Sequence, residues 1–305
     1  ETMYNYQSIL HQVVHNLLGN ADDPKHIRVY NLDKSEIIKS LQENNDRLGL
    51  FSFHGYTAIL NYLFGEIDPA RKEQEETKKY LITVTGGLYH FALYYFYSSL
   101  IMLAQTRESS LTKNKKTLKK VRYYVGKLEL WTKYAPMNFE HKYLLVKAEL
   151  ARAEKDYLSA EKLYEQAAEK AGKNEFIQEQ AMAYELAANF YLQRDLEQIA
   201  GLYFNRAIIS FAQWGAVAKV NHLKSKHLDL ISSQAQEAME LDTLGNETDS
   251  TTTGKAMVDL YTVLKASQAI SGEIVLERVL EQLMKIGIEN AGAQRGVLLF
   301  EQQGK

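Results

Sequence analysis

A 40-residue internal repeat constrains the fold of this 305-residue chain more than any other feature of its sequence. The segments DYLSAEKLYEQAAEKA at 156–171 and LEQIAGLYFNRAIISF at 196–211 share a small residue, then an aromatic residue, then a second small residue. In both copies another alanine lies 12 positions before the first small residue, and the pair Ala58 and Ala70 repeats that spacing upstream. The repeated positions are Ala148, Ala160, Tyr164 and Ala167 in one copy, and Ala188, Ala200, Phe204 and Ala207 in the next.

Small and aromatic residues at these spacings suit stacked pairs of antiparallel helices. Alanine lets two helices approach closely where they cross, and the aromatic residue fills the space against the next pair. One pair cannot bury its apolar face alone, so successive pairs stack into a solenoid. Apolar periodicity extends the pattern and predicts an all-α fold, with helices near 3–18, 34–45, 48–64, 69–84, 88–105, 111–133, 138–154, 157–171, 175–193, 197–213 and 215–241.

Helix-end signals agree with this interpretation. Asp68 before Pro69 and Asn138 before an apolar run are typical N-caps. Gly19, Gly65 and Gly172 fall where the periodicity stops, as expected for left-handed residues at helix ends.

The small–aromatic–small pattern resembles the tetratricopeptide repeat. The resemblance implies an α-solenoid that binds other proteins, with clear repeats over 136–241 and degenerate helical repeats over 1–135. Two features depart from the family pattern: the period exceeds the usual length, and the expected proline at the repeat end is missing, with Gly172 and Gly215 there instead. A generic helical bundle with coincidental alanines is the alternative, since alanine is common in helices.

The sequence changes character after 241. The stretch DTLGNETDSTTTG at 242–254 is small and polar, which predicts a flexible linker. The remainder, 255–305, contains two amphipathic segments and the short apolar run GVLLFE at 296–301. This order of helix, break, helix and strand resembles the entry into a GAF domain, of which the chain would contain two helices and one strand.

Two longer stretches resemble one family of signalling proteins. These are APMNFEHKYLLVKAELARAEKDYLSAEKLYEQA and LKASQAISGEIVLERVLEQLMKIGIENAGAQRGVLLF. In this family, very large cyanobacterial-type proteins, a Ser/Thr-kinase-like domain and a predicted ATPase precede a long tetratricopeptide-like region, which is followed by GAF and a histidine kinase. The resemblance implies that the catalytic motifs lie outside this chain. The first residue is Glu1 and the chain ends after the predicted strand, so we expect a fragment of a longer protein.

Composition excludes several classes of function. The chain has no cysteine, which rules out disulfides, a thiol nucleophile and cysteine zinc ligands, and which suits a reducing cytoplasm. Its formal net charge of −2 gives no general attraction to nucleic acid or anionic membrane. Neither a signal peptide nor an apolar run of about 20 residues is visible. We therefore predict protein partners, no cofactor, no nucleic acid and no membrane.

The segment HQVVH places His11 and His15 on one face of a helix, the spacing that zinc proteases use for two ligands. The residue that would act as general base is Gln12, an amide, and no third ligand stands out in the sequence. We therefore predict neither catalytic nor functional metal binding, and treat a helical metalloenzyme as an alternative that zinc analysis would test.

Two further segments have a structural interpretation and a binding alternative. The basic run TKNKKTLKKVR at 112–122 is predicted to be a solvated helix face, with a docking surface for an acidic partner as the alternative. The aromatic stretch GGLYHFALYYFYSSLIMLA at 86–104 is predicted to be a buried helix, with the lining of a peptide or ligand groove as the alternative.

Together these features predict a non-catalytic interaction and relay segment of a sensor kinase. The helical array would couple upstream domains to the GAF and kinase output. The alternative is a helical-repeat sensor arm of an ATPase-type transcription regulator. The eight repeat positions are predicted to be structural, and no catalytic, cofactor or metal residue is predicted.

Overall fold

The computed structural model describes residues 2–29, 32–83, 88–106 and 111–231. The chain divides into two compact units, Glu1–His227 and Leu228–Lys305. The first unit contains nearly all of the described residues. The predicted linker at 242–254 and the predicted GAF start at 255–305 lie outside the described residues, as does the predicted boundary at 241.

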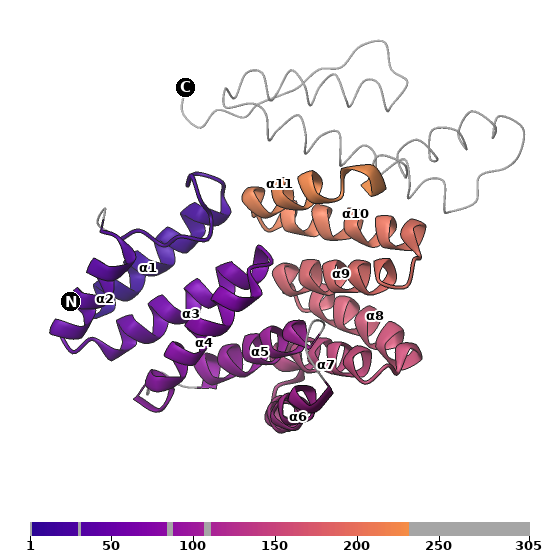
Figure 1. The fold of residues 1–305 in the computed structure, drawn as a ribbon, viewed down its shortest axis with the longest axis horizontal. Helices are drawn as coiled ribbons and strands as arrows, with labels where there is room; N and C mark the ends of the chain where they lie inside the picture. The colour runs from indigo at the N-terminus through magenta and orange to yellow at the C-terminus, as the bar shows by residue number, and fades with distance from the viewer. Residues whose placement is uncertain (1, 30–31, 84–87, 107–110, 232–305) are drawn as a thin grey trace, which may run out of the picture. The chain divides into compact units, whose positions relative to one another are not determined.

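The described part of the chain is helical, as the sequence predicts, and contains no β-strand beyond an isolated bridge between Val29 and Leu32. A short 3₁₀ turn, η1 (Leu81–Thr83), follows α4. The helices, labelled in Figure 1, are α1 (Thr2–Leu17), α2 (Lys34–Glu43), α3 (Arg47–Leu63), α4 (Ile67–Tyr80), α5 (Leu88–Gln105), α6 (Leu111–Tyr134), α7 (Pro136–Ala153), α8 (Tyr157–Lys173), α9 (Ile177–Leu192), α10 (Glu197–Gln213) and α11 (Val217–Lys226).

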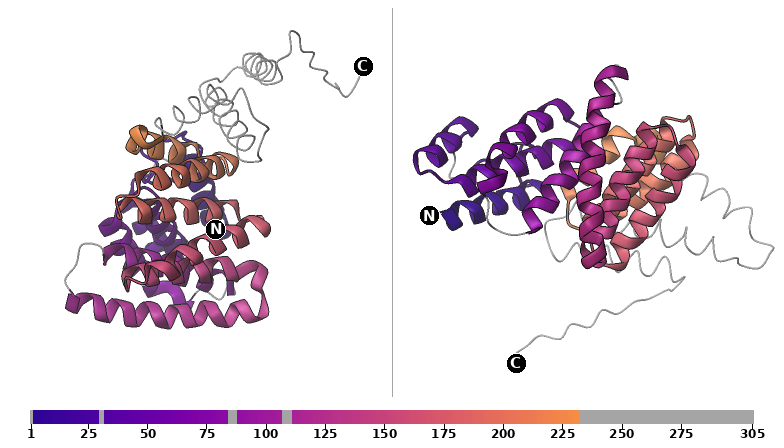
Figure 2. Two further views of the ribbon diagram at one scale, coloured as in Figure 1. Left: turned by 90° about the vertical axis from the view of Figure 1, so that its right-hand side faces the viewer. Right: turned by 90° about the horizontal axis from the view of Figure 1, so that it is seen from below.

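Antiparallel helix pairs stack one after another through most of this unit. The pairs are α3 with α4, α5 with α6, α7 with α8, and α9 with α10. The first helices of the pairs lie side by side, because α5 contacts both α3 and α7, and α7 contacts α9. Figures 1 and 2 show this row, with α6 running past the ends of its neighbours. The row curves enough for α11 to contact α1, so the last and first helices of the unit meet.

The backbone repeats with the same period as the sequence. Lys155 and Asp195 follow α7 and α9 with φ of 64° and 57°, and Glu175 and Gly215 follow α8 and α10 with φ of 63° and 86°. In each turn the next amide donates to a carbonyl five residues earlier, which is the Schellman geometry that satisfies the last helix carbonyls. Since the positions within each pair are 40 apart, the turns confirm the period that the alanines indicate.

Two predicted N-caps are wrong. The helix α4 begins at Ile67, so Asp68 lies within its first turn. Gly65, with φ of 82°, has already reversed the chain, and the helix restarts immediately after it. The helix α7 begins at Pro136, which places Asn138 inside it as well. In both places the tight turn, rather than a capping side chain, sets the start of the helix.

One predicted helix-end glycine is also wrong. Gly172 lies inside α8, and the left-handed position of that turn is occupied by Glu175. Gly19 and Gly65 are confirmed, with φ of 86° and 82°. The helix predicted over 215–241 is interrupted at His227, directly after α11.

None of the described helices combines the length and the apolar character that crossing a bilayer requires. The most apolar of them, α5, lies in the interior, as its composition predicts, with Phe96, Leu100, Ile101 and Leu103 fully buried. Its apolar surface is therefore covered by neighbouring helices on several sides.

Candidate functional site

All eight predicted repeat positions lie in the buried face between paired helices. Ala148, Ala160, Ala188, Ala200, Phe204 and Ala207 have no exposed surface, and Ala167 and Tyr164 are 1% and 2% exposed. The structure brings them together in two groups, one where α7 crosses α8 and one where α9 crosses α10. Their contribution to stability remains a prediction.

Enlarging an alanine at a crossing should separate the two helices. We expect Ala160→Leu and Ala200→Leu each to lower the free energy of unfolding by about 1–3 kcal/mol, because neither site has space for the added carbons. Thermal unfolding followed by circular dichroism measures the effect, with Gln166→Leu as the exposed control on α8. Unchanged melting temperatures in both alanine variants would contradict the repeat assignment.

A buried charge cluster surrounds one of these aromatic residues. The Tyr164 hydroxyl donates to Glu149, whose carboxylate also pairs with Arg152 at 2.7 Å. Glu149 is 1% exposed and Arg152 8% exposed. The nearby carboxylate outweighs burial and raises the pKa of Arg152, which therefore stays charged.

The next repeat lacks this cluster entirely. Counting 40 residues from Tyr164, Glu149 and Arg152 leads to Phe204, Asn189 and Leu192. The aromatic residue has lost its hydroxyl where the carboxylate and guanidinium are also missing. Sequence reasoning overlooked the cluster, although comparing the two copies position by position would have revealed it.

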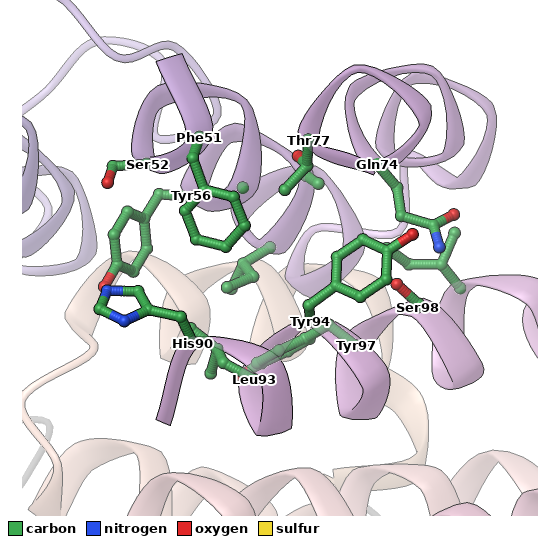
Figure 3. A pocket seen from close by; sticks show the side chains of 14 residues that line it. Phe51, Ser52, Tyr56, Gln74, Thr77, His90, Leu93, Tyr94, Tyr97 and Ser98 are labelled. Atoms are coloured by element: carbon green, nitrogen blue, oxygen red, sulfur yellow. The ribbon is translucent and has the colours of Figure 1, made fainter. Parts of the chain in front are cut away.

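An apolar slot lies between α3, α4 and α5 (Figure 3). Ala58 and Ala70 precede Ala148 and Ala160 by 90 residues, which aligns Gln74 with Tyr164. The slot therefore lies where the aromatic residue of the repeat is replaced by an amide. Its lining comprises Phe51, Ser52, Gly55, Tyr56, Ala58, Ile59, Gln74, Thr77, His90, Leu93, Tyr94, Tyr97, Ser98 and Ile101.

The slot is too small to be a ligand pocket. Its volume is 30 Å³, enough for roughly two water molecules. Ser98, which is 1% exposed, has a hydroxyl oxygen without a hydrogen-bond partner among the described residues. The slot is thus a packing gap with room for water, and the ligand-groove alternative for α5 gains no support from it.

The histidine pair has no third candidate metal ligand beside it in the part of the chain that the structure describes. His11 is exposed on α1, and no group of three or more potential metal ligands occurs among the described residues. Gln12, at the position of a protease base, instead donates to Asn16 at 2.8 Å, and Asn16 holds the carbonyl of His26 at 2.7 Å. The polar residues of this helix therefore fasten the loop that follows it.

Charged residues are buried along the inner row of helices. Lys142 on α7 and Glu179 on α9 form an ion pair of 2.9 Å, with side chains only 7% and 5% exposed. The Lys142 ammonium also lies 4.2 Å from the centre of the Phe176 ring. On the same row the Tyr97 hydroxyl of α5 contacts the Met182 sulfur of α9 at 3.5 Å. These contacts fill the space between α5, α7 and α9.

A buried histidine in this interior is expected to make the folded protein less stable in acid. His141 is 1% exposed and its Nε2 accepts from Lys142 at 2.8 Å. Burial, and then the Lys142 ammonium, lower the pKa of His141 from 6.5 to about 3. Between these two values the unfolded chain binds a proton that the folded chain does not. The stability that His141 contributes is therefore full above pH 6.5 and is lost as the pH falls toward about 3.

We expect the free energy of unfolding to fall by about 2 kcal/mol through His141 alone between roughly pH 7 and pH 5. Urea titrations at the two pH values measure this loss, which should shrink in His141→Gln. Some loss will remain, because burial also lowers the pKa of His227, to about 4. Equal pH dependence in the wild type and the variant would contradict the assignment.

A pocket of 260 Å³ remains open where the inner row ends, and we call it the inner pocket. Five helices contribute to it: the end of α3, the first residue of α4, the end of α5, the middle of α9, and α11. Its lining comprises Tyr62, Leu63, Gly65, Ile67, Ala104, Met182, Glu185, Leu186, Asn189, Lys219, His222 and Lys226.

Lys219 closes the helix row at this pocket. Its side chain is 1% exposed, pairs with Glu185 on α9 at 2.7 Å, and donates to the carbonyl of Leu63 at the end of α3. Next to it the rings of His222 and Phe64 pack edge to face, 5.4 Å apart. Burial, and then the ammonium of Lys219, lower the pKa of His222, which favours a neutral imidazole. One lysine thus links α11 to two helices that precede it in the chain.

Stacked helix pairs with small–aromatic–small crossings define a helical-repeat protein. Residues 75–194, from the second half of α4 through α9, match a family model described as CHK1-like, TPR repeats. A segment of 43 residues is 51% identical to hybrid signal transduction histidine kinase G of Dictyostelium discoideum. This match covers 14% of the chain and 1% of the length of that protein. No solved structure matches the chain.

Proposed function

We propose that this chain is a non-catalytic protein-interaction and signal-relay segment of a multidomain sensor kinase. It would couple upstream kinase-like and ATPase domains to a GAF and histidine-kinase output. The observation that carries the proposal is the row of helix pairs that matches tetratricopeptide repeats, since this architecture binds proteins on extended surfaces. The short identity to a hybrid histidine kinase supports the kind of parent protein.

The inner pocket is the surface where we propose that a protein segment binds. It has apolar walls from Leu63 and Met182 and polar groups from Asn189 and Lys226, the mixture typical of a site that fixes both position and orientation. Five helices contribute to it, so an occupant would contact the beginning, middle and end of the row together.

The position of α11 supports the proposed relay. This helix lines the inner pocket, and the chain enters its second unit at Leu228, two residues after the helix ends. An occupant that displaces Lys219 from Glu185 or from the Leu63 carbonyl would shift α11. Such a shift in helix packing is a known way to pass a signal along a chain.

The test has two parts. The purified chain, incubated with ATP, should neither hydrolyse it nor incorporate phosphate. In cells, Asn189→Trp in the full-length parent protein should fill the inner pocket and alter the phosphorylation of the parent. Leu158→Trp, at an exposed position of α8, is the control and should leave phosphorylation unchanged.

Two results would contradict the proposal. ATP turnover by the purified chain would show that it is catalytic. Wild-type phosphorylation of the Asn189→Trp parent would show that the inner pocket takes no part in the relay.

A further inference from the structure

A second surface, on the outer side of the helix row, has the form of an elongated groove. It runs between α4 and α6, and the end of α5 forms its floor. Two adjoining pockets, of 490 and 280 Å³, make up this α4–α6 groove. They share four lining residues, which makes the groove continuous: Arg71, Met102, Gln105 and Thr117.

One end of the groove is strongly cationic. The smaller pocket is lined by Arg71, Lys78, Lys116 and Lys120, against the single carboxylate of Glu75. That carboxylate is already paired with Arg71 at 2.7 Å. Within the described ranges, Lys78, Lys116 and Lys120 form no ion pair. Burial, and then the charge of Lys78, lower the pKa of Lys120.

The other end of the groove is acidic and therefore limits the possible ligand. Glu66 and Asp68 line the larger pocket, where Glu66 pairs with Lys25 at 3.1 Å and Asp68 accepts from Gln105 at 3.2 Å. A uniform polyanion such as a nucleic acid backbone would be repelled there. An anion with charge at one end only would fit both halves.

We propose that the α4–α6 groove binds an acidic peptide segment of a partner protein. Its carboxylates would pair with Lys78, Lys116 and Lys120, while its other half would lie over Met102 and the polar groups of the larger pocket. Charge complementarity and the length of the groove carry this assignment. The cationic end of the groove shares no lining residue with the inner pocket, although the acidic end adjoins that pocket at Gly65, Ile67 and Ala104. The cationic end therefore adds an interaction surface to the one in the proposed function. It also gives part of the basic run at 112–122 a role beyond solvation.

Fluorescence anisotropy of a labelled hexaglutamate peptide tests the proposal on the whole chain. We expect saturable binding that weakens as salt is added. The double variant Lys78→Glu/Lys120→Glu should bind about tenfold more weakly or worse, because two attractive contacts become repulsive. Lys162→Glu, an exposed site on α8 with the same change of charge, is the control and should bind as the wild type does.

Labelled hexalysine and a single-stranded oligonucleotide complete the set of probes. Each is titrated separately with the chain, because hexalysine would pair with hexaglutamate in a mixture, and both should bind more weakly than hexaglutamate does. Four results would overturn the proposal: no binding of hexaglutamate by the wild type, equal binding by the double variant, equal weakening in Lys162→Glu, or tighter binding of the oligonucleotide. Circular dichroism of each variant verifies that the fold is intact, which is expected because Lys78, Lys120 and Lys162 are exposed.

Discussion

Replacing Glu149 with asparagine is expected to lower the free energy of unfolding by about 3–5 kcal/mol. The variant leaves the guanidinium of Arg152 without its partner in a site where that residue is 8% exposed. It also removes the acceptor of the Tyr164 hydroxyl. An uncompensated buried charge costs much more than the net contribution of the pair, so the loss should exceed that of an ordinary core substitution. Urea denaturation monitored by circular dichroism measures it.

The neighbouring repeat suggests a variant that should restore the lost stability. The triple variant Glu149→Asn, Arg152→Leu and Tyr164→Phe copies Asn189, Leu192 and Phe204 into the α7–α8 pair. It should recover most of the lost stability and come within about 1–2 kcal/mol of the wild type, since no buried charge is left unpaired. A triple variant as unstable as the single variant would show that the cluster is not interchangeable between repeats.

Lys219→Met is the second substitution expected to have a large effect. It should lower the free energy of unfolding by about 3 kcal/mol, because methionine can neither pair with Glu185 nor donate to Leu63. The lower end of the usual range applies, because Glu185 is 19% exposed and water can reach it. Hydrogen exchange should also become faster in α11 and in the last turn of α3, which this side chain joins.

Lys226→Met, at an exposed position of the same helix, is the control for this experiment. It should change stability by less than about 0.5 kcal/mol, as exposed substitutions usually do. If both variants unfold at the same urea concentration as the wild type, Lys219 does not hold the ends of the row together.

The turns illustrate how much of the fold the sequence predicts. Glycine at positions 19 and 65 indicates a left-handed turn correctly, because glycine adopts positive φ at no steric cost. Lys155 and Asp195 adopt the same conformation without any such signal. Helix packing on both sides of the turn outweighs the local preference there, and sequence alone therefore misplaces some helix ends by a few residues.

The candidate sites were harder to predict than the fold. The basic run on α6 is evident in the sequence, but the α4–α6 groove also needs Arg71 and Lys78 from the preceding pair. The slot in Figure 3 follows from Gln74 at an aromatic position, a replacement that becomes visible only after the repeats are aligned. In each case the sequence pattern of one helix is recognisable. The residues that complete the site come from another helix, which the sequence alone does not place beside it.

Stacked helix pairs can be predicted from the sequence, because small and aromatic residues at fixed spacing allow few other packings. The curvature that brings Lys219 to the carbonyl of Leu63, 156 positions earlier, is evident only in the folded protein. The curvature is the sum of small rotations between successive pairs, and no single segment encodes that sum. This curvature determines which charged residues become buried partners and where a pocket stays open.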